Sequence, residues 1–251
     1  MTSFSHSGNL GDVIWSLPTV KHFGGGDFYI ILNGVSAAIR KYNNGPVFPE
    51  YENRLSEKDY SLLAPLLEAQ PYINKVAVYN GEKIDYDLDL FRGTVGEEFK
   101  TNFIETYAQT FNLPYDPATS FAPWLAVTPN RVAKFVVART ARYHSNRTTT
   151  IPTWITVMCE NKVTADSVFI GMPDEHAAFQ DLFNVSIPYY KCKDFLDMAE
   201  VIAGADGFMS NQTFAYSIAR GLGKQTVLET LSYRPLQTNE CYFPIDNCYY
   251  F

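Results

Sequence analysis

Residues 7–13 read Ser-Gly-Asn-Leu-Gly-Asp-Val, and this segment decides how the first part of the chain is expected to fold. Two glycines and an asparagine permit tight turns and left-handed backbone, and they let a ligand approach the main chain closely. Residues 13–22 have the apolar spacing of a helix, and Asp12 is placed to cap it. We therefore predict a loop that follows a short apolar stretch at Phe4 and leads into a helix.

An alternation of strands and helices continues after this loop. Residues 28–32 are a run of β-forming apolar residues ended by Asn33-Gly34, which is typical of a buried strand. The next predicted elements, in chain order, are a helix at 56–69, strands at 75–79 and 86–91, and a helix at 102–111. Strands that alternate with helices in this way predict a parallel sheet.

Residues 113–129 contain prolines at 114, 117, 123 and 129 and few continuous elements, so they are the predicted boundary between two domains. The alternation then starts again. Strands are expected at 133–138, 167–171, 185–189, 207–210 and 225–228, with helices after Pro152 and at 174–183, 194–203 and 212–220. The chain is therefore expected to be an α/β protein with two Rossmann-like domains, residues 1–122 and 123–251.

The composition is that of a globular protein. Of the 251 residues, 46% are hydrophobic, which suffices for one large core or two smaller ones. The aromatic content of 15% is high. Its simplest explanation is that large side chains fill two α/β cores, and an aromatic surface for a sugar or a partner is the alternative. The formal charge of -7 argues against electrostatic binding of nucleic acid by the whole protein.

Cysteines, histidines and the N-terminus indicate the cellular compartment of the protein and whether it binds a metal. The cysteines are scattered without Cys-x-x-Cys spacing, which is typical of reduced core residues. The histidines share no metal-binding pattern, so no metal site is expected. The sequence shows no secretory signal and no apolar run of membrane length. These features predict a soluble, cytoplasmic protein.

The segment at 7–13 supplies four candidate site residues: Ser7, Asn9, Gly11 and Asp12. In open α/β sheets, ligands bind at the carboxyl ends of strands, where this loop is predicted to lie. A carboxylate at that position can take the proton of an acceptor hydroxyl as a general base. The alternative is that Asp12 is only a helix cap.

A basic cluster after the predicted strand 133–138 is the second candidate. Arg139, Arg142 and Arg147 gather there, with His144, in an otherwise acidic protein. Arginine donates paired hydrogen bonds to phosphate oxygens, so this loop is predicted to bind a diphosphate. An exposed basic loop without a ligand is the alternative.

Two further strand ends and the end of the last predicted strand carry candidate residues. Asn211, Gln212 and Thr213 leave a predicted strand and open a predicted helix, where backbone amides can bind an anion, or where Asn211 simply caps the helix. Glu175 lies in another strand-to-helix turn, and Glu229 follows the last predicted strand. Both carboxylates are candidates for hydrogen bonds to ribose hydroxyls, although acidic residues in a first turn also stabilise helices.

These motifs and their order resemble the heptosyltransferase-like family of GT-B glycosyltransferases, which includes the ADP-heptose:lipopolysaccharide enzymes. The first signature lies in residues 11–18, where Gly-Asp-Val-Ile is followed by Leu-Pro. The second runs through residues 195–227, and the pattern Gly-x-Pro-x-Glu at 171–175 adds a third point of similarity. Together the motifs cover most of the chain.

The resemblance implies a compact version of the GT-B fold, in which two Rossmann-like domains face a cleft. It implies that Asp12 is the general base of an inverting sugar transfer. It also implies that Arg139 and Arg142 lie in the diphosphate loop, Glu175 near the nucleotide ribose, and residues 211–213 at the donor phosphates. Cationic side chains and backbone amides would then stabilise the leaving diphosphate, so that no metal is required.

The predicted function is a metal-independent, inverting glycosyltransferase, hexosyl- or heptosyltransferase-like. It would move a sugar from a nucleoside-diphosphate sugar to a hydroxyl of a carbohydrate or glycoconjugate acceptor, with no cofactor besides the donor substrate. Two alternatives are kept. One is a non-catalytic nucleotide-sugar-binding protein of the same fold. The other is a glycosyltransferase acting on modified DNA bases, which the negative charge disfavours.

Overall fold

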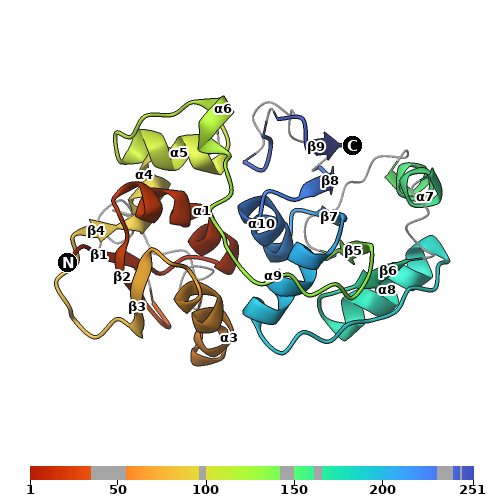
Figure 1. Ribbon diagram of the computed structural model, residues 1–251, viewed down its shortest axis with the longest axis horizontal. Coiled ribbons are helices and arrows are strands. Elements are labelled where there is room, and N and C mark those ends of the chain that lie inside the picture. The colour runs from red at the N-terminus through yellow and green to blue at the C-terminus, as the bar shows by residue number, and fades with distance from the viewer. Residues whose placement is uncertain (35–54, 96–99, 142–149, 161–165, 231–239, 244) are drawn as a thin grey trace.

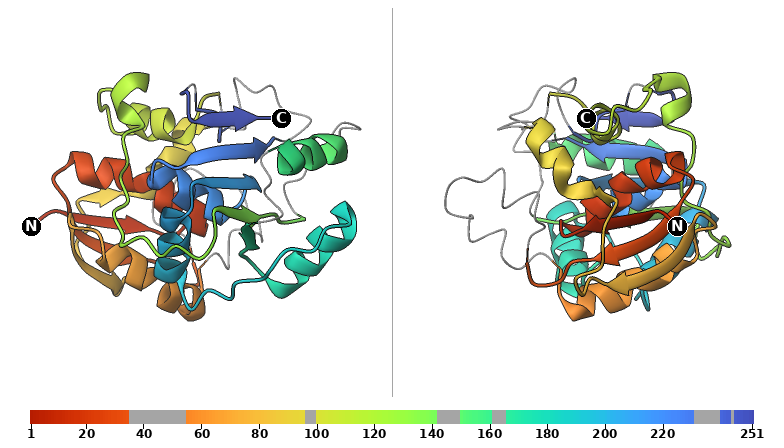
Figure 2. Two further views of the ribbon diagram at one scale, coloured as in Figure 1. Left: turned by 45° about the vertical axis from the view of Figure 1, so that its right-hand side comes forward. Right: turned by 90° about the vertical axis from the view of Figure 1, so that its left-hand side faces the viewer.

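The protein contains two parallel β-sheets with helices packed around them, as a computed structural model shows (Figure 1). The structure describes residues 1–34, 55–95, 100–141, 150–160, 166–230, 240–243 and 245–251. The two sheets lie towards opposite ends of the molecule, and both chain termini lie at its surface (Figures 1 and 2). The prediction of an α/β protein with two Rossmann-like halves is confirmed.

The first sheet is built from the N-terminal part of the chain and has the order β3-β2-β1-β4. Its strands are β1 (Ser3–His6), β2 (Gly26–Ile30), β3 (Ile73–Val78) and β4 (Tyr86–Asp87). The helices of this half are α1 (Leu10–His22), α3 (Glu57–Glu68), the 3-10 helix η2 (Leu88–Leu90), α4 (Phe91–Val95), α5 (Phe103–Thr110) and α6 (Pro117–Ser120). Ser56 and Asn102 cap α3 and α5, so both helices begin where the sequence predicts.

The second sheet has the order β6-β5-β7-β8-β9. Its strands are β5 (Phe135–Ala138), β6 (Ser167–Phe169), β7 (Gly207–Asn211), β8 (Gln225–Glu229) and β9 (Cys248–Tyr250). The helices of this half are α7 (Thr150–Glu160), α8 (Pro173–Phe183), α9 (Phe195–Gly204) and α10 (Phe214–Gly221). All strand pairs are parallel, as the alternation of strands and helices predicts.

Two strand predictions differ from the structure, and one observed strand was not predicted. Only the start of the predicted strand 86–91 is extended, because the Asp87 carboxylate accepts the amide of Asp89 at 3.1 Å and turns the chain into η2. The predicted strand 185–189 is reduced to a single bridge, because Pro188 has no N–H with which to continue a ladder. Strand β9 has no counterpart in the sequence-based prediction.

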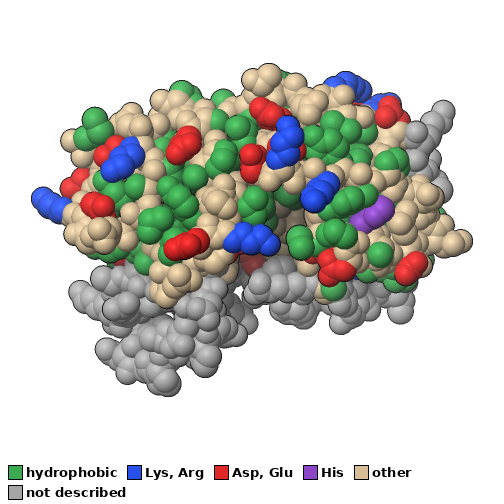
Figure 3. Space-filling model, turned by 90° about the horizontal axis from the view of Figure 1, so that it is seen from below, with side chains coloured by type: hydrophobic (Ala, Val, Ile, Leu, Met, Phe, Trp, Pro, Cys, Tyr) green, Lys and Arg blue, Asp and Glu red, His purple; other side chains and the backbone are tan. Residues whose placement is uncertain are grey.

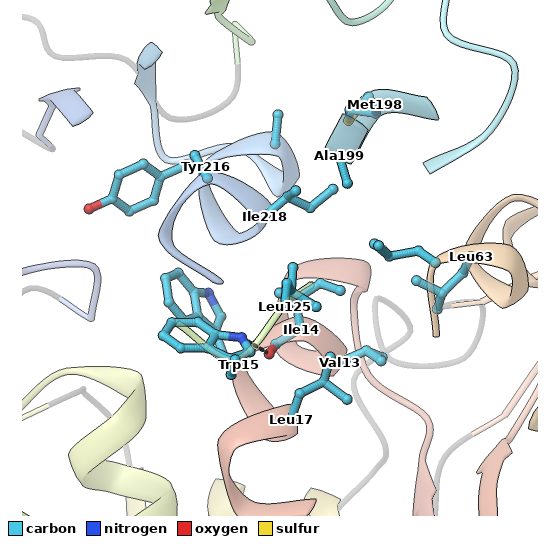
Figure 4. Close-up of a cluster of buried hydrophobic side chains, with 14 of the residues drawn as sticks. Val13, Ile14, Trp15, Leu17, Leu63, Leu125, Met198, Ala199, Tyr216 and Ile218 are labelled. Carbon is cyan, nitrogen blue, oxygen red and sulfur yellow. Dashed lines mark hydrogen bonds between the residues drawn. The ribbon is translucent and has the colours of Figure 1, made fainter. Parts of the chain in front are cut away.

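Helices α1 and α10 pack against each other and join both sheets to one hydrophobic core (Figure 4). Trp15 of α1 lies at the centre of this contact. Its ring is 6.2 Å from the ring of Tyr216 on α10, 5.2 Å from that of Phe243 and 5.5 Å from that of Phe103 on α5. Aromatic side chains thus fill the interior, as the composition predicts.

A proline inside α1 creates a contact with the segment that connects the two halves. Pro18 has no N–H, so the carbonyl of Ile14, one turn earlier, loses its partner within the helix. The indole N–H of Trp124 donates to this carbonyl at 3.1 Å. The Leu-Pro part of the first signature therefore fixes the connecting segment to α1.

The same segment lies against the C-terminal end of α10. The amides of Trp124 and Leu125 both donate to the Gly221 carbonyl at 2.9 Å. A side chain at Gly221 would come within 2.7 Å of Leu125, so only glycine permits this approach. Gly223 has a positive φ of +69° beside Pro123. The glycines of the second signature thus serve the packing of the connecting segment, and the domain division at residues 122 and 123 stays a prediction.

The described part of the chain contains neither a membrane-spanning helix nor a cluster of metal-binding side chains. No helix there is long and apolar enough to cross a bilayer. The same residues contain no group of three or more His, Cys, Asp or Glu side chains that could hold a metal ion. On the face seen in Figure 3, basic side chains are interspersed with acidic ones and form no continuous basic area.

We expect Trp124→Phe to lower the free energy of unfolding by about 1–3 kcal/mol, because it leaves the buried Ile14 carbonyl without a donor. In a Pro18→Ala background, residue 18 regains its N–H and supplies that donor, so the same substitution should cost less. Urea denaturation of the four proteins measures the difference. Equal costs in the two backgrounds would show that only the packing of the indole matters.

Candidate active site

A cavity of about 310 Å³ lies where the first turn of α1 meets the first turn of α10. Its lining residues are Asn9, Leu10, Gly11, Asp12, Trp15, Phe103, Gln212, Thr213, Phe214, Glu240 and Cys241. Two segments of the chain that are about 200 residues apart in sequence therefore meet at one site. Five predicted site residues are brought together: Asn9, Gly11 and Asp12 from the first half, and Gln212 and Thr213 from the second.

Asp12 lies within α1 and does not cap it. The helix begins at Leu10, with the exposed Asn9 at the cap position, so Asp12 is the third helical residue. The predicted start at residue 13 is wrong by one turn, and the Asp12 carboxylate pairs with Arg92. A carboxylate in the first turn is also favoured by the helix dipole.

Arg92 of α4 forms a close ion pair with Asp12. Its Nη2 donates to Asp12 Oδ2 at 2.5 Å, and its Nε lies 3.6 Å from Asp89 Oδ1. The side chains of Arg92 and Asp12 are 21% and 11% exposed, so the pair is largely shielded from water at the edge of the cavity. Burial disfavours the charged guanidinium, but the two carboxylates outweigh it and raise the pKa of Arg92 above its ordinary value.

Asp89 anchors the loop before α1. The amide and the hydroxyl of Ser7 both donate to Asp89 Oδ2, at 2.7 and 2.6 Å. Ser7 and Asp89 are fully buried. Ser7, a predicted contact for a ligand, therefore directs its hydroxyl to a carboxylate behind the loop, and it does not line the cavity.

A buried histidine completes the wall behind the loop. The Gly8 amide donates to His6 Nδ1 at 2.8 Å, which places the ring proton on Nε2. Nε2–H then donates to the Tyr107 hydroxyl at 3.0 Å, and that hydroxyl donates to the main-chain oxygen of Asp12 at 3.2 Å. Burial lowers the pKa of His6 below its ordinary value, although Asp89, 3.2 Å from Nδ1, favours the charged ring. The neutral imidazole fits the hydrogen bonds.

The first turn of α10 presents the positive end of its dipole to the cavity. Thr213 is the cap residue, and its hydroxyl accepts the Tyr216 amide at 3.1 Å. The alternative that Asn211 caps this helix is wrong. Asn211 is buried at the end of β7, where its side chain accepts from the Thr140 amide at 3.1 Å and donates to the Thr140 carbonyl at 2.7 Å. It ties β7 to the segment after β5.

Comparisons with solved structures find similar folds across the whole chain. A glycosyl transferase family 9 protein of Veillonella parvula DSM 2008 has a TM-score of 0.56 and 10% identity, over 90% of this chain and 79% of that one. E. coli heptosyltransferase WaaC with ADP has a TM-score of 0.52 and 12% identity, over 99% of this chain and 92% of that one. The chain has the GT-B fold.

A further GT-B structure is similar over the full length. E. coli ADP-heptose lps heptosyltransferase II has a TM-score of 0.53 and 10% identity, over 100% of this chain and 90% of that one. No protein-family description and no curated protein matches the sequence. The similarity is therefore one of fold, and in this GT-B chain the cavity lies where the helices of the two Rossmann-like halves meet.

Arg139 and Glu229, two of the residues predicted to contact the sugar-nucleotide donor, form an ion pair with each other. Arg139 donates to Glu229 through Nε at 2.8 Å and through Nη2 at 3.2 Å. Trp154 Nε1 donates to the same carboxylate at 2.9 Å. Arg139 and Glu229 do not line the cavity described above, and Arg142 and Arg147 lie outside the described residues. The diphosphate loop therefore stays a prediction.

Glu175 occupies the first turn of α8 and acts on the start of that helix. Its carboxylate accepts the Met172 amide at 2.9 Å and lies where a side chain at Gly171 would be. Gly171 has a φ of +133°, so the turn requires glycine for both space and conformation. The structure shows Glu175 stabilising a helix, and its contact with a ribose stays a prediction.

Sequence reasoning missed the residues that hold Asp12. Asp89 and Arg92 fall at the end of a predicted strand, His6 follows the apolar stretch at Phe4, and Tyr107 falls within the predicted helix 102–111. The available signal was the Asp-x-x-Arg spacing in an apolar stretch, since charged residues are rarely buried without partners. Their partners could not be named without the tertiary structure.

The neutral state of His6 makes stability depend on pH. Its pKa lies below 6.5 in the folded protein, so the unfolded chain binds more protons once the pH falls below about 6.5. The stability that neutral His6 contributes is complete above that pH and is lost as the pH falls further. For one group the slope reaches about 1.4 kcal/mol per pH unit.

We expect His6→Gln to reduce the loss of unfolding free energy between pH 7 and pH 5, because glutamine has no proton to gain. Urea denaturation across this range measures it. His22→Gln is the control, since His22 is exposed and should leave the wild-type dependence in place. A His6→Gln protein with the wild-type slope would contradict a neutral His6.

Proposed function

We propose that the protein is a metal-independent, inverting glycosyltransferase that moves a sugar from a nucleoside-diphosphate sugar to a hydroxyl of a carbohydrate or glycoconjugate. The observation that carries this proposal is the position of Asp12. Its carboxylate lines the same cavity as the first turn of α10. A candidate base and a helix end suited to anions therefore share one site.

The reaction places Asp12 at the acceptor. Its carboxylate takes the proton of the acceptor hydroxyl while that oxygen bonds to the anomeric carbon. The bond between this carbon and the diphosphate oxygen breaks, and the nucleoside diphosphate leaves with the electron pair. Attack from the side opposite the leaving group inverts the anomeric carbon. A carboxylate held in place before the substrates arrive lowers the entropic cost of this step.

The leaving diphosphate is assigned to the second half of the chain. The positive end of the α10 dipole faces the cavity through Gln212, Thr213 and Phe214, and it can stabilise negative charge as the diphosphate departs. One similar structure, E. coli heptosyltransferase WaaC, was solved with ADP, which supports a nucleoside-diphosphate sugar as the donor class. Residues 1–122 then serve the acceptor and residues 123–251 the donor.

The other residues predicted to contact the donor, Arg139, Glu229 and Glu175, already bind other groups of the protein. Direct contact of a donor with Arg139 or Glu229 would require their ion pair to open. Glu175 would have to reach a ribose while it holds the start of α8. Gln212 and Thr213 line the cavity at the first turn of α10, so we propose them as the first contacts of the diphosphate.

We expect Asp12→Asn to lower kcat about 100- to 10,000-fold, the usual contribution of a general base, with little change in donor binding. Incubation with a panel of sugar nucleotides and acceptors, followed by mass spectrometry of the product and the released nucleoside diphosphate, measures the rate. Asp197→Asn is the matched control. Asp197 is also buried and is the third residue of its helix, but it does not line the cavity.

The outcomes separate the proposal from its rivals. If Asp12→Asn transfers sugar as fast as the unchanged protein, Asp12 is not the base. If the protein binds sugar nucleotides but no acceptor yields a product, it is a nucleotide-sugar-binding protein of the same fold. Transfer to duplex DNA containing modified bases, with binding that weakens steeply as salt rises, would support the third possibility.

A further inference from the structure

Arg92 lies directly behind Asp12 and is held there by further contacts. Its Nη2 donates to Asp12 Oδ2 at 2.5 Å, and its Nε lies 3.6 Å from Asp89 Oδ1. The guanidinium also lies over the ring of Phe91, 4.6 Å from its centre. These neighbours fix a single conformation in which a cation faces the carboxylate of the cavity.

The loop before α1 is shaped around this guanidinium. A side chain at Gly8 would overlap both Arg92 and His6. The Gly8 amide donates to His6, and the next residue towards the N-terminus, Ser7, donates twice to Asp89. Each residue of this loop segment therefore either makes room for Arg92 or fixes a group beside it.

Asp12 lines the cavity, and one oxygen of its carboxylate is bound by Arg92. Among the described residues, Oδ2 is the oxygen that accepts a hydrogen bond, and Asp12 lines the cavity. Oδ1 is then the oxygen that an acceptor hydroxyl can reach. The other titratable groups around it are Asp89 and His6 behind Arg92, Tyr107 on the main-chain oxygen of Asp12, and Glu240 on the cavity wall.

From this geometry we infer that Arg92 is a positioning residue for the transfer reaction, which orients Asp12 so that Oδ1 meets the acceptor hydroxyl. This inference rests on the function proposed above. The acceptor proton goes to Oδ1, the acceptor oxygen bonds to the anomeric carbon, and the nucleoside diphosphate leaves. Arg92 exchanges no proton in this step and touches no substrate atom.

A direct substrate contact by Arg92 would leave a different kinetic signature. A guanidinium that binds an anionic substrate acts mainly on KM, because the contact is already made in the ground state. A guanidinium that orients the base acts mainly on kcat, because the alignment of the base matters in the transition state. The two roles are therefore distinguished by the same set of rate measurements.

The test compares Arg92→Met, Arg92→Lys and the double variant Asp89→Asn/Arg92→Met. The double variant guards against misfolding, because it removes the Asp89 charge that Arg92→Met leaves buried without its cation. Arg131→Met is the control. Arg131 forms an exposed ion pair with Asp206 and does not line the cavity.

Two readouts are taken on each protein. The first is kcat of transfer, with KM for both substrates. The second is the 13C resonance of the Asp12 carboxyl at one pH, assigned with Asp12→Asn, which needs no activity. We expect kcat to fall about 10- to 100-fold in the two Arg92→Met proteins, because a misplaced base loses its alignment with the acceptor hydroxyl. We also expect the Asp12 resonance to change in both proteins, because its carboxylate loses the hydrogen bond to Oδ2.

Arg92→Lys keeps a charged donor and should recover part of the lost kcat, with donor KM within about twofold throughout. An unchanged kcat with an unchanged resonance, or a change confined to KM, would overturn the inference. If the resonance changes but kcat does not, Asp12 is not the base, and the proposed function fails instead. If no transfer occurs with any acceptor, the resonance alone still decides whether Arg92 controls Asp12.

Discussion

The packing of α1 against α10 is the contact on which the rest of the structure depends. Trp15 fills the space between the two helices and contacts rings from both halves of the chain. Because the two helices meet near their first turns, a helix end from each half lines one cavity. Pro18 adds a second tie, since the carbonyl it frees is taken up by Trp124 of the connecting segment.

The charged side chains buried behind the loop before α1 cost free energy of hydration that an apolar wall would not cost. Buried carboxylates and guanidinium groups lose their hydration, and they are tolerated only when each is paired. Here Asp12 and Asp89 share Arg92, and Ser7 supplies two further donors. An apolar wall would hold the loop at less cost, so the charged arrangement fits a site in which a carboxylate has to be held in one orientation.

The second half meets the cavity in a different way. Its strong charged pair, Arg139 with Glu229, is satisfied internally, and Asn211 is used to tie two strand ends together. What this half presents to the cavity is the start of α10, with Gln212, Thr213 and Phe214, together with Glu240 and Cys241. The dipole of that helix is a fixed positive end that needs no side-chain movement to meet an anion.

The sequence alone determined the architecture, because alternating strand and helix patterns and the glycine-rich turns are local properties of the chain. It also placed Asn9, Gly11, Asp12, Gln212 and Thr213 at strand ends, where sites in such sheets lie. Only the tertiary structure decided their partners. Arg92 reaches Asp12 across 80 positions and Arg139 reaches Glu229 across 90, and no local pattern carries pairings at such distances. Packing of distant elements decides which charges meet and which remain facing the cavity.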